Sequence, residues 1–293
     1  MRITDGIRYL RSIKTVAEAA LRFDRAARVA ATGKRVELPS DGPAAYASML
    51  AHSERLKRLD VRAEVLGRTT SDLEIAEGSL ASATDVVAHV REIAVQMANG
   101  TLNAADRTGA AAEVRSLRAT LSGLANSKGQ NGYLFGGTRV DTAPFDTNAA
   151  YQGNLDALRV EVADGVTESV SLSGADAFTA SGVNGRDAFV VLDALTLALG
   201  ANDLTGIRDS LDAIDGVLGQ LSNVRADAGA KIDRLRAAQA FATDTTVLVA
   251  KGRAAAVEAD PIQAFSELTR AKTAYEQSLE VTKKLLALSS LGQ

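Results

Sequence analysis

The strongest constraint on the fold of this chain is an apolar repeat with alternating spacings of three and four residues, which places a narrow apolar stripe along a helix. One repeat runs from about residue 56 to 94, and a second runs from about residue 204 to 249. A helix cannot bury such a stripe by itself, so each long helix needs a neighbouring helix. The stripes comprise Leu59, Ala63, Leu66, Thr70, Leu73, Leu80, Thr84, Val87 and Ala94, and Leu204, Ile207, Leu211, Ile214, Leu218, Leu221, Ala228, Ile232, Leu235, Ala242 and Val249.

Both ends of the chain carry shorter repeats of the same kind, which predict two terminal helices that pair with each other. A neighbouring stripe begins with Ile3, Ile7 and Leu10. The paired stripes are Ile13, Val16, Ala20, Phe23, Ala27 and Ala30 at the amino end, and Phe265, Leu268, Tyr275, Leu279, Thr282 and Leu286 at the carboxyl end.

Glycine, proline and capping residues divide the chain into helices. Gly33 is expected to end the first helix, and Ser40 or Asp41 to cap the long helix that follows. Asn99-Gly100 interrupts the repeat, and a shorter helix is expected near residues 104–127. Asp260-Pro261 is typical of the start of a helix, because proline needs no hydrogen-bond acceptor there.

One segment in the middle of the chain favours β structure. Residues 158–162 and 166–172 alternate apolar and polar side chains on either side of Asp164-Gly165, a pattern that predicts a β-hairpin. Aromatic residues make up only 4% of the chain, so we expect packing through thin aliphatic contacts rather than a thick globular core.

The predicted fold is therefore mainly α, an elongated helical bundle or coiled-coil rod with paired terminal helices and a small central β-rich insert. Residues 1–40 and 258–293 are expected to form terminal assembly helices that are disordered in the monomer. Residues 41–137 and 187–257 form the predicted long-helix rod, and residues 138–186 form the insert.

The charge distribution argues against a nucleic-acid-binding protein. The formal net charge is -3, although residues 1–40 carry nine Lys or Arg against four Asp or Glu. Residues 138–200 reverse this balance, with three basic against nine acidic residues. No apolar run has the roughly 18 residues needed to span a bilayer, so no membrane span is expected.

No group of residues predicts a catalytic, cofactor-binding or metal site. The chain has no cysteine, and its two histidines, His52 and His89, lack a second ligand at metal-binding spacing. Gly33-Lys34-Arg35 lacks the earlier glycine and the Ser or Thr of a phosphate-binding loop, so a helix end is the better interpretation. We therefore expect that the protein is not an enzyme and that it binds no cofactor.

Several segments together resemble the bacterial flagellin family over nearly the whole chain. Both ends take part, through Met1-Arg2-Ile3-Thr4, Thr32 to Val36, Pro39 to Pro43, and Ala271 to Leu291. Asn131 to Gly137 and Tyr151 to Asn154 are similar to the branch of the family that joins the flagellar hook to the filament.

The resemblance implies a structural subunit of the bacterial flagellum, exported unfolded by the flagellar type III apparatus to an extracellular position between hook and filament. Its implied partners are flagellin, hook-associated protein 1, other copies of itself in a ring, and an export chaperone. From the apolar spacing, the expected assembly contacts are Ile3, Ile7, Leu10, Ile13, Leu279, Leu286 and Leu288.

Two other functions stay open on the sequence alone. A filament flagellin would polymerise into long fibres, whereas a junction protein would occupy a short zone and need partners. A cytoplasmic coiled-coil scaffold would have stable terminal helices and would not be exported.

Overall fold

The computed structural model describes residues 2–181 and 185–290, and it divides the chain into two compact units. Residues 1–58 and 246–293 form unit 1, and residues 59–245 form unit 2. Two helices contribute to both units, α2 (Pro43–Met97) and α6 (Leu204–Val257). The prediction of a mainly α fold with long helices and a small β-containing insert is confirmed.

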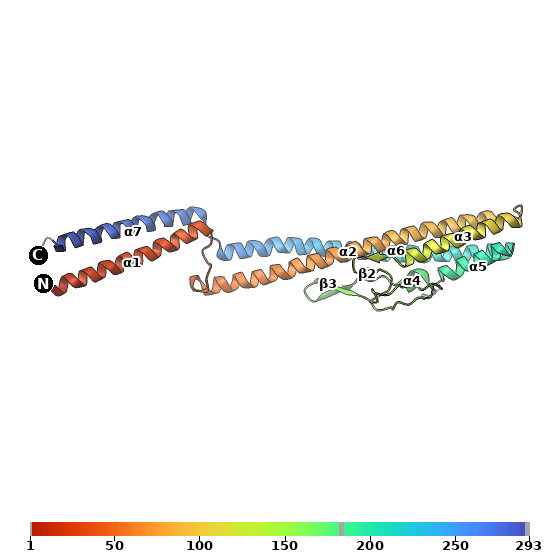
Figure 1. Ribbon diagram of the computed structural model, residues 1–293, viewed down its shortest axis with the longest axis horizontal. Coiled ribbons are helices and arrows are strands. Elements are labelled where there is room, and N and C mark those ends of the chain that lie inside the picture. The colour runs from red at the N-terminus through yellow and green to blue at the C-terminus, as the bar shows by residue number, and fades with distance from the viewer. Residues whose placement is uncertain (1, 182–184, 291–293) are drawn as a thin grey trace. The chain divides into compact units, whose positions relative to one another are not determined.

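Unit 1 contains the terminal helices, α1 (Arg2–Thr32) and α7 (Pro261–Ser290), which lie side by side (Figure 1). Gly33 ends α1 with a φ of +68°, a conformation that glycine adopts at little cost. Asp260 caps α7, because its Oδ1 accepts hydrogen bonds from the backbone N–H of Ile262 at 2.8 Å and of Gln263 at 3.3 Å. Both helix boundaries therefore agree with the sequence prediction.

The cap expected at Ser40 or Asp41 is wrong. A short 3-10 helix, η1 (Pro39–Asp41), precedes α2, and Asp41 Oδ2 accepts from the backbone N–H of Glu37 at 3.1 Å and of Leu38 at 3.0 Å. These hydrogen bonds, first that of Leu38, hold the pKa of the Asp41 carboxyl below its ordinary value. Asp41 therefore orders the turn before α2 instead of the first turn of α2.

In unit 2, the core takes side chains from α2, α3 (Ala104–Ala125), the short helix α4 (Gly174–Phe178), α5 (Ala188–Gly200) and α6. Reciprocal hydrogen bonds between Asn103 and Asp106 cap α3, at 2.9 and 3.1 Å. Ion pairs also bridge α2 and α6, with Arg225 to Glu77 at 2.8 Å and Arg236 to Glu74 at 2.7 Å. Most of the predicted stripe positions on both long helices are buried.

The sequence analysis did not identify α5 as a separate helix, although it included these residues in the long-helix segment 187–257. Asp187 caps this helix by accepting from the backbone N–H of Val190 at 3.0 Å. Its buried side chains lie on more than one side of the helix. The sequence of α5 therefore contains apolar residues outside a single stripe with alternating three- and four-residue spacing, and the repeat that marks the long helices is not visible in it. The buried residues are Ala188, Phe189, Val191, Leu192, Leu195 and Leu199.

Two small antiparallel β-hairpins complete unit 2. The first pairs β1 (Lys128–Gly129) with β2 (Gly132–Tyr133). The second pairs β3 (Arg159–Ala163) with β4 (Val166–Ser169) around Gly165, whose φ is +75°. The hairpin predicted from the sequence is this second one. Its first strand is shifted by one residue from the predicted 158–162, and its second strand ends at Ser169 instead of residue 172.

Ion pairs join the β3–β4 hairpin to both long helices. Arg62 on α2 contacts Glu161 at 2.8 Å and Asp164 at 2.6 Å, while Arg234 on α6 contacts Glu168 at 2.7 Å. Val160 on β3 is buried in the core of unit 2. The hairpin is therefore attached to the rest of unit 2 by an apolar contact through Val160 and by ion pairs at its edges.

Aromatic side chains form a compact cluster that the sequence analysis did not expect. Phe145 lies at the centre, with ring centroids 5.3 Å from Phe189, 5.3 Å from Tyr151 and 5.7 Å from Phe178. Phe135 packs edge-on against Phe178 at 5.6 Å. The expectation of thin aliphatic packing alone is therefore wrong for this part of unit 2, since five of the few aromatic residues meet at one place.

The two motifs that resembled the junction branch of the family pack against each other beside this cluster. Tyr151 donates its hydroxyl hydrogen bond to the backbone oxygens of Phe135 at 3.1 Å and Asn154 at 3.0 Å. Asn154 Oδ1 accepts from the backbone N–H of Thr138 at 2.9 Å. Gly137 has a φ of +68° and no room for a Cβ against Asn154, which explains glycine at this position.

Candidate assembly surface on the terminal helices

The contact between α1 and α7 is narrow and built mostly from small side chains. Its largest element is a stack of Phe23 on Tyr275, with ring centroids 5.9 Å apart and planes inclined by 5°. Nearer the ends of the two helices, the hydroxyls of Ser12 and Thr282 lie 2.5 Å apart. Two helices that meet through small residues bury little apolar surface, so this pair gains limited stability from its own contact.

The contact stripe on α7 differs from the predicted one at its start. Ala264 is buried, whereas Phe265 is 59% exposed. The sequence pattern favoured Phe265 because it is large and apolar, but close approach of the two helix backbones selects the small alanine at the contact. Leu268, Tyr275, Leu279 and Thr282 are half-buried, as a stripe through these positions predicts.

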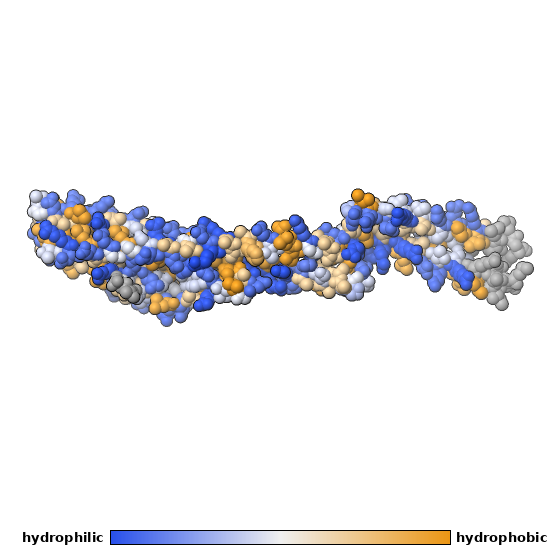
Figure 2. Space-filling view, turned by 180° about the vertical axis from the view of Figure 1, so that it is seen from behind, coloured by the Kyte–Doolittle hydropathy of each residue, from blue (hydrophilic) through white to orange (hydrophobic). Residues whose placement is uncertain are grey.

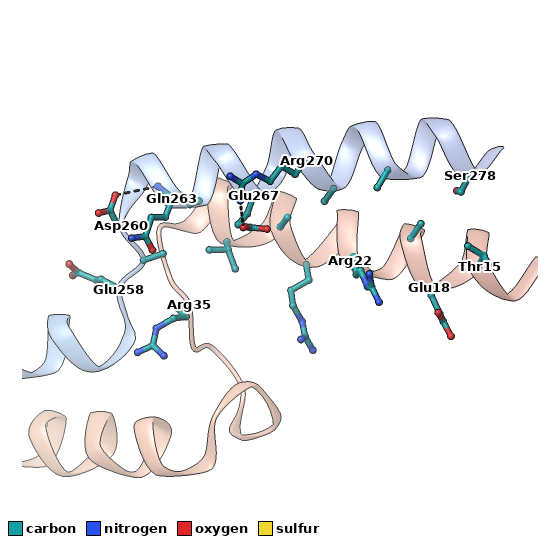
Figure 3. Close-up of a pocket in the computed structure, with 18 of the residues that line it drawn as sticks. Thr15, Glu18, Arg22, Arg35, Glu258, Asp260, Gln263, Glu267, Arg270 and Ser278 are labelled. Carbon is teal, nitrogen blue, oxygen red and sulfur yellow. Dashed lines mark hydrogen bonds and ion pairs between the residues drawn. The ribbon is translucent and has the colours of Figure 1, made fainter. Parts of the chain in front are cut away.

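A groove of about 850 Å³ runs along this helix pair (Figure 3). Its wall contains short side chains from both helices, from the end of α6 and from the segment between α6 and α7, namely Ala19, Ala26, Val29, Ala255, Ala259, Ala264, Ala271 and Ala274. Charged residues of both signs line it as well, and Arg270 pairs with Glu267 at 3.1 Å. A groove with a small-residue wall and mixed charges suits the side of another helix better than a small polar ligand.

Backbone hydrogen bonds tie the segment after α1 to the segment before α7. Arg35 N–H donates to the backbone oxygen of Val257 at 2.7 Å, and Ala259 N–H donates to that of Gly33 at 2.9 Å. Lys34 and Glu258 form an isolated antiparallel bridge between the same segments. The two terminal helices are therefore held together at their inner ends by main-chain contacts as well as by side chains.

Large apolar side chains on the terminal helices remain exposed. Ile262 is 82% exposed, Leu21 is 70% exposed and Leu10 is 66% exposed. Isolated exposed apolar residues are common on protein surfaces, but a series along one helix pair marks a surface that can be covered by a partner. Figure 2 shows such apolar patches, separated by hydrophilic areas, on one face of the molecule.

The structure places the predicted assembly residues in different environments. Ile7, Leu10 and Ile13 are exposed on α1, and Leu279 is half-buried on α7. The side chains of Ile3, Leu286 and Leu288 lie outside the described part of the structure. The sequence analysis missed Leu21, Ile262 and Phe265 as exposed positions, since a one-dimensional pattern does not reveal which apolar residues the partner helix leaves uncovered.

The two histidines contact side chains or backbone of neighbouring helices. His52 packs against Gly252 on α6. His89 on α2 lies between Glu113 on α3, at 3.2 Å, and Glu92, at 3.3 Å. These two carboxylates, first Glu113, raise the pKa of the His89 imidazole above its ordinary value.

Among residues 2–181 and 185–290, no group of three or more His, Cys, Asp or Glu side chains is arranged to hold a metal ion. Within the same residues, no helix combines the length and apolar character needed to cross a membrane.

Comparisons with known proteins point to one family. The model of the bacterial flagellin N-terminal helical region matches residues 7–140. The chain is 25% identical to flagellar hook-associated protein 3 of Escherichia coli, over 99% of this chain and 98% of that protein. It is 28% identical to flagellar hook-associated protein 3 of Salmonella typhimurium, over 68% of this chain and 67% of that protein.

A solved structure agrees in fold. Flagellar hook-associated protein 3 from Legionella pneumophila has a TM-score of 0.62 and 17% sequence identity, covering 69% of this chain and 96% of that chain.

Proposed function

Because the chain belongs to the bacterial flagellin family, we propose that it is a structural subunit of the bacterial flagellum that joins the hook to the filament. The observation that carries this proposal is the similarity to hook-associated protein 3 over nearly the full length of both proteins, terminal regions included. We assign it no catalytic role.

The terminal helix pair supports an assembly role on physical grounds. The contact between α1 and α7 is narrow, and exposed apolar side chains line the pair. Covering these side chains with neighbouring subunits would remove apolar surface from water and stabilise both helices. We propose that Ile3, Ile7, Leu10, Ile13, Leu279, Leu286 and Leu288 make such contacts, together with Leu21, Ile262 and Phe265.

The proposed role specifies partners and location. The subunit would contact hook-associated protein 1 on the hook side, flagellin on the filament side and other copies of itself around the ring. It would reach this extracellular position by flagellar type III export, with an export chaperone that protects the terminal helices. In the free monomer these helices would be poorly ordered, because large apolar side chains such as Leu10, Leu21 and Ile262 are exposed to water.

Immunogold electron microscopy of flagella tests the proposal, using an antibody against residues 138–186. We propose that these residues form the surface insert. The long-helix segments 41–137 and 187–257 flank the insert in the sequence, and the terminal assembly segments 1–40 and 258–293 lie outside them. We expect label confined to the junction of hook and filament. Label along the whole filament would instead identify a filament flagellin, and intact flagella without label would contradict both flagellar functions.

A further inference from the structure

A second apolar groove lies in unit 2, between α5 and the start of α6. It has a volume of about 570 Å³. Val191, Ala198 and Ala213 contribute to its lining, while Val190 and Leu197 stand at its margin, 62% and 73% exposed. The helix pair is already capped and packed on its inner side, so the exposed residues are not needed for the core of unit 2.

The chain around this groove is strongly acidic. Residues 187–215 contain six Asp and one Arg. Asp193 pairs with Arg118 at 2.6 Å, and Asp215 pairs with Arg91 at 2.6 Å. Asp209 lines the groove, and neither it nor Asp212, one turn further along, forms an ion pair with any residue that the structure describes. The groove therefore presents apolar side chains beside Asp209 and Asp212, two carboxylates that no ion pair among the described residues neutralises.

Unit 1 carries a surface of the opposite character. Residues 43–58 of α2 and 246–257 of α6 together contain five Lys or Arg and one Glu. The two segments lie side by side, since His52 packs against Gly252. Leu50, Val247 and Leu248 are exposed on them, at 47%, 50% and 68%.

The cations of this surface are available for a partner. Lys57 contacts Glu54 at 3.8 Å on the same helix. Arg55, Arg58, Lys251 and Arg253 make no ion pair within the described residues. An exposed apolar ridge flanked by unpaired cations is complementary to an apolar groove flanked by unpaired carboxylates.

We propose that the α5–α6 groove of one copy receives the basic ridge around Leu248 of a second copy. The two surfaces belong to different parts of the chain, so the contact is heterologous: each copy uses its groove for one neighbour and its ridge for another. Repetition of a heterologous contact generates a ring when the rotation closes. This inference rests on the proposed function, and it specifies which faces of the subunits meet.

Cysteine cross-linking in isolated flagella tests the contact, because the chain has no cysteine of its own. The double variant Leu197→Cys/Leu248→Cys is expressed in place of the natural chain, and flagella are isolated and treated with a short bismaleimide. Both side chains are exposed, so the substitutions leave the core of the protein unchanged. The two single variants are the matched controls.

We expect the double variant to give a ladder of dimers, trimers and larger products, while neither single variant cross-links. Dimers from Leu197→Cys alone would mean that two grooves face each other and would overturn the proposal. Chain present in the isolated flagella without any ladder would overturn it as well, while leaving the proposed function intact. Absence of the chain from isolated flagella, detected by immunoblot, would overturn the proposed function and the inference with it.

Charge reversal checks the electrostatic part of the proposal. Asp209→Lys in the double-cysteine background should lower the cross-linked fraction about tenfold, and adding Lys251→Asp should restore much of it. Asp85→Lys, an exposed substitution on α2 outside both surfaces, should change little. Equal losses for Asp209→Lys and Asp85→Lys, or no rescue by Lys251→Asp, would contradict the charge pairing.

Discussion

At the scale of single residues, Arg107 is the most unusual side chain in unit 2. It is only 2% exposed, and no carboxylate pairs with it among the described residues. Its Nε donates to the backbone oxygen of Met97 at 3.1 Å, its Nη2 donates to that of Asn99 at 2.8 Å, and its Nη1 donates to Asn202 Oδ1. Arg107 thereby satisfies acceptors at the end of α2 and joins them to the turn between α5 and α6.

Replacing Arg107 should destabilise unit 2. Arg107→Ala removes the guanidinium hydrogen bonds to the Met97 and Asn99 oxygens and creates a cavity, so we expect a loss of about 3 kcal/mol in the free energy of unfolding. Arg107→Lys should recover little of it, because an ammonium group does not reproduce the planar fork of donors.

Urea denaturation of the full chain measures this loss, with Arg115→Ala as the control. Arg115 is exposed on the same helix, and its Nε donates only to the backbone oxygen of Ala111 one turn earlier. The control should stay within about 0.5 kcal/mol of the natural chain. If Arg107→Ala behaves like the control, the buried guanidinium does not hold this end of unit 2 together.

At the scale of elements, contacts between helices depend on small apolar residues in some places and on ion pairs in others. The stripe on α7 uses Ala264 instead of Phe265, which brings the backbones of α1 and α7 close together. On the outside of α2 and α3, His89 bridges the two helices through Glu113. A bridge of this kind responds to pH, because only the protonated imidazole attracts both carboxylates.

The raised pKa of His89 predicts the sign of that response. A group whose pKa is higher in the folded state stabilises the fold fully below its unfolded value of about 6.5 and loses this contribution as pH rises through the folded value. We therefore expect His89→Gln to lower the urea midpoint at pH 5.5 more than at pH 8.5.

Glu113→Gln should reproduce this pattern, since it removes the first cause of the shift. High salt should shrink the difference between natural chain and variant, because the bridge is partly exposed. A His89→Gln effect that is equal at both pH values would show that the imidazole does not act through its charge.

At the scale of the whole molecule, the chain combines a unit with its own buried core and a unit whose terminal helices leave apolar side chains uncovered. Unit 2 contains the aromatic cluster and the main buried cluster of apolar residues. Unit 1 contains the α1–α7 pair, with its stacked Phe23 and Tyr275 and its alanine-lined groove. Stability is therefore expected to depend mainly on the core of unit 2, and the α1–α7 pair is expected to contribute mainly to assembly.

Deletion of residues 1–30 should separate these two properties. The shortened chain should keep a cooperative thermal transition from unit 2, because the contacts of its core do not involve α1. It should fail to restore motility in a strain that lacks the natural protein, because the proposed assembly contacts on α1 are gone. Restored motility would refute the assembly role of α1, and loss of the thermal transition would refute the independence of unit 2.

The sequence by itself determined the long helices, their order and most of their boundaries. Alternating three- and four-residue spacings on α2 and α6 depend only on helix geometry, and Gly33, Asn103 and Asp260 act within a few residues of their own positions. For the same reason, the sequence alone predicted the β3–β4 turn at Gly165.

Tertiary structure alone decided which apolar residues are covered. The burial of Ala264 beside exposed Phe265, the burial of α5 on more than one side, and the meeting of Phe135, Phe145 and Phe178 all depend on residues far away in the sequence. The complementary groove and ridge proposed here are equally hidden from a linear pattern. The burial of a residue and the charge around it depend on which distant segments pack against it, and a local sequence repeat does not specify that packing.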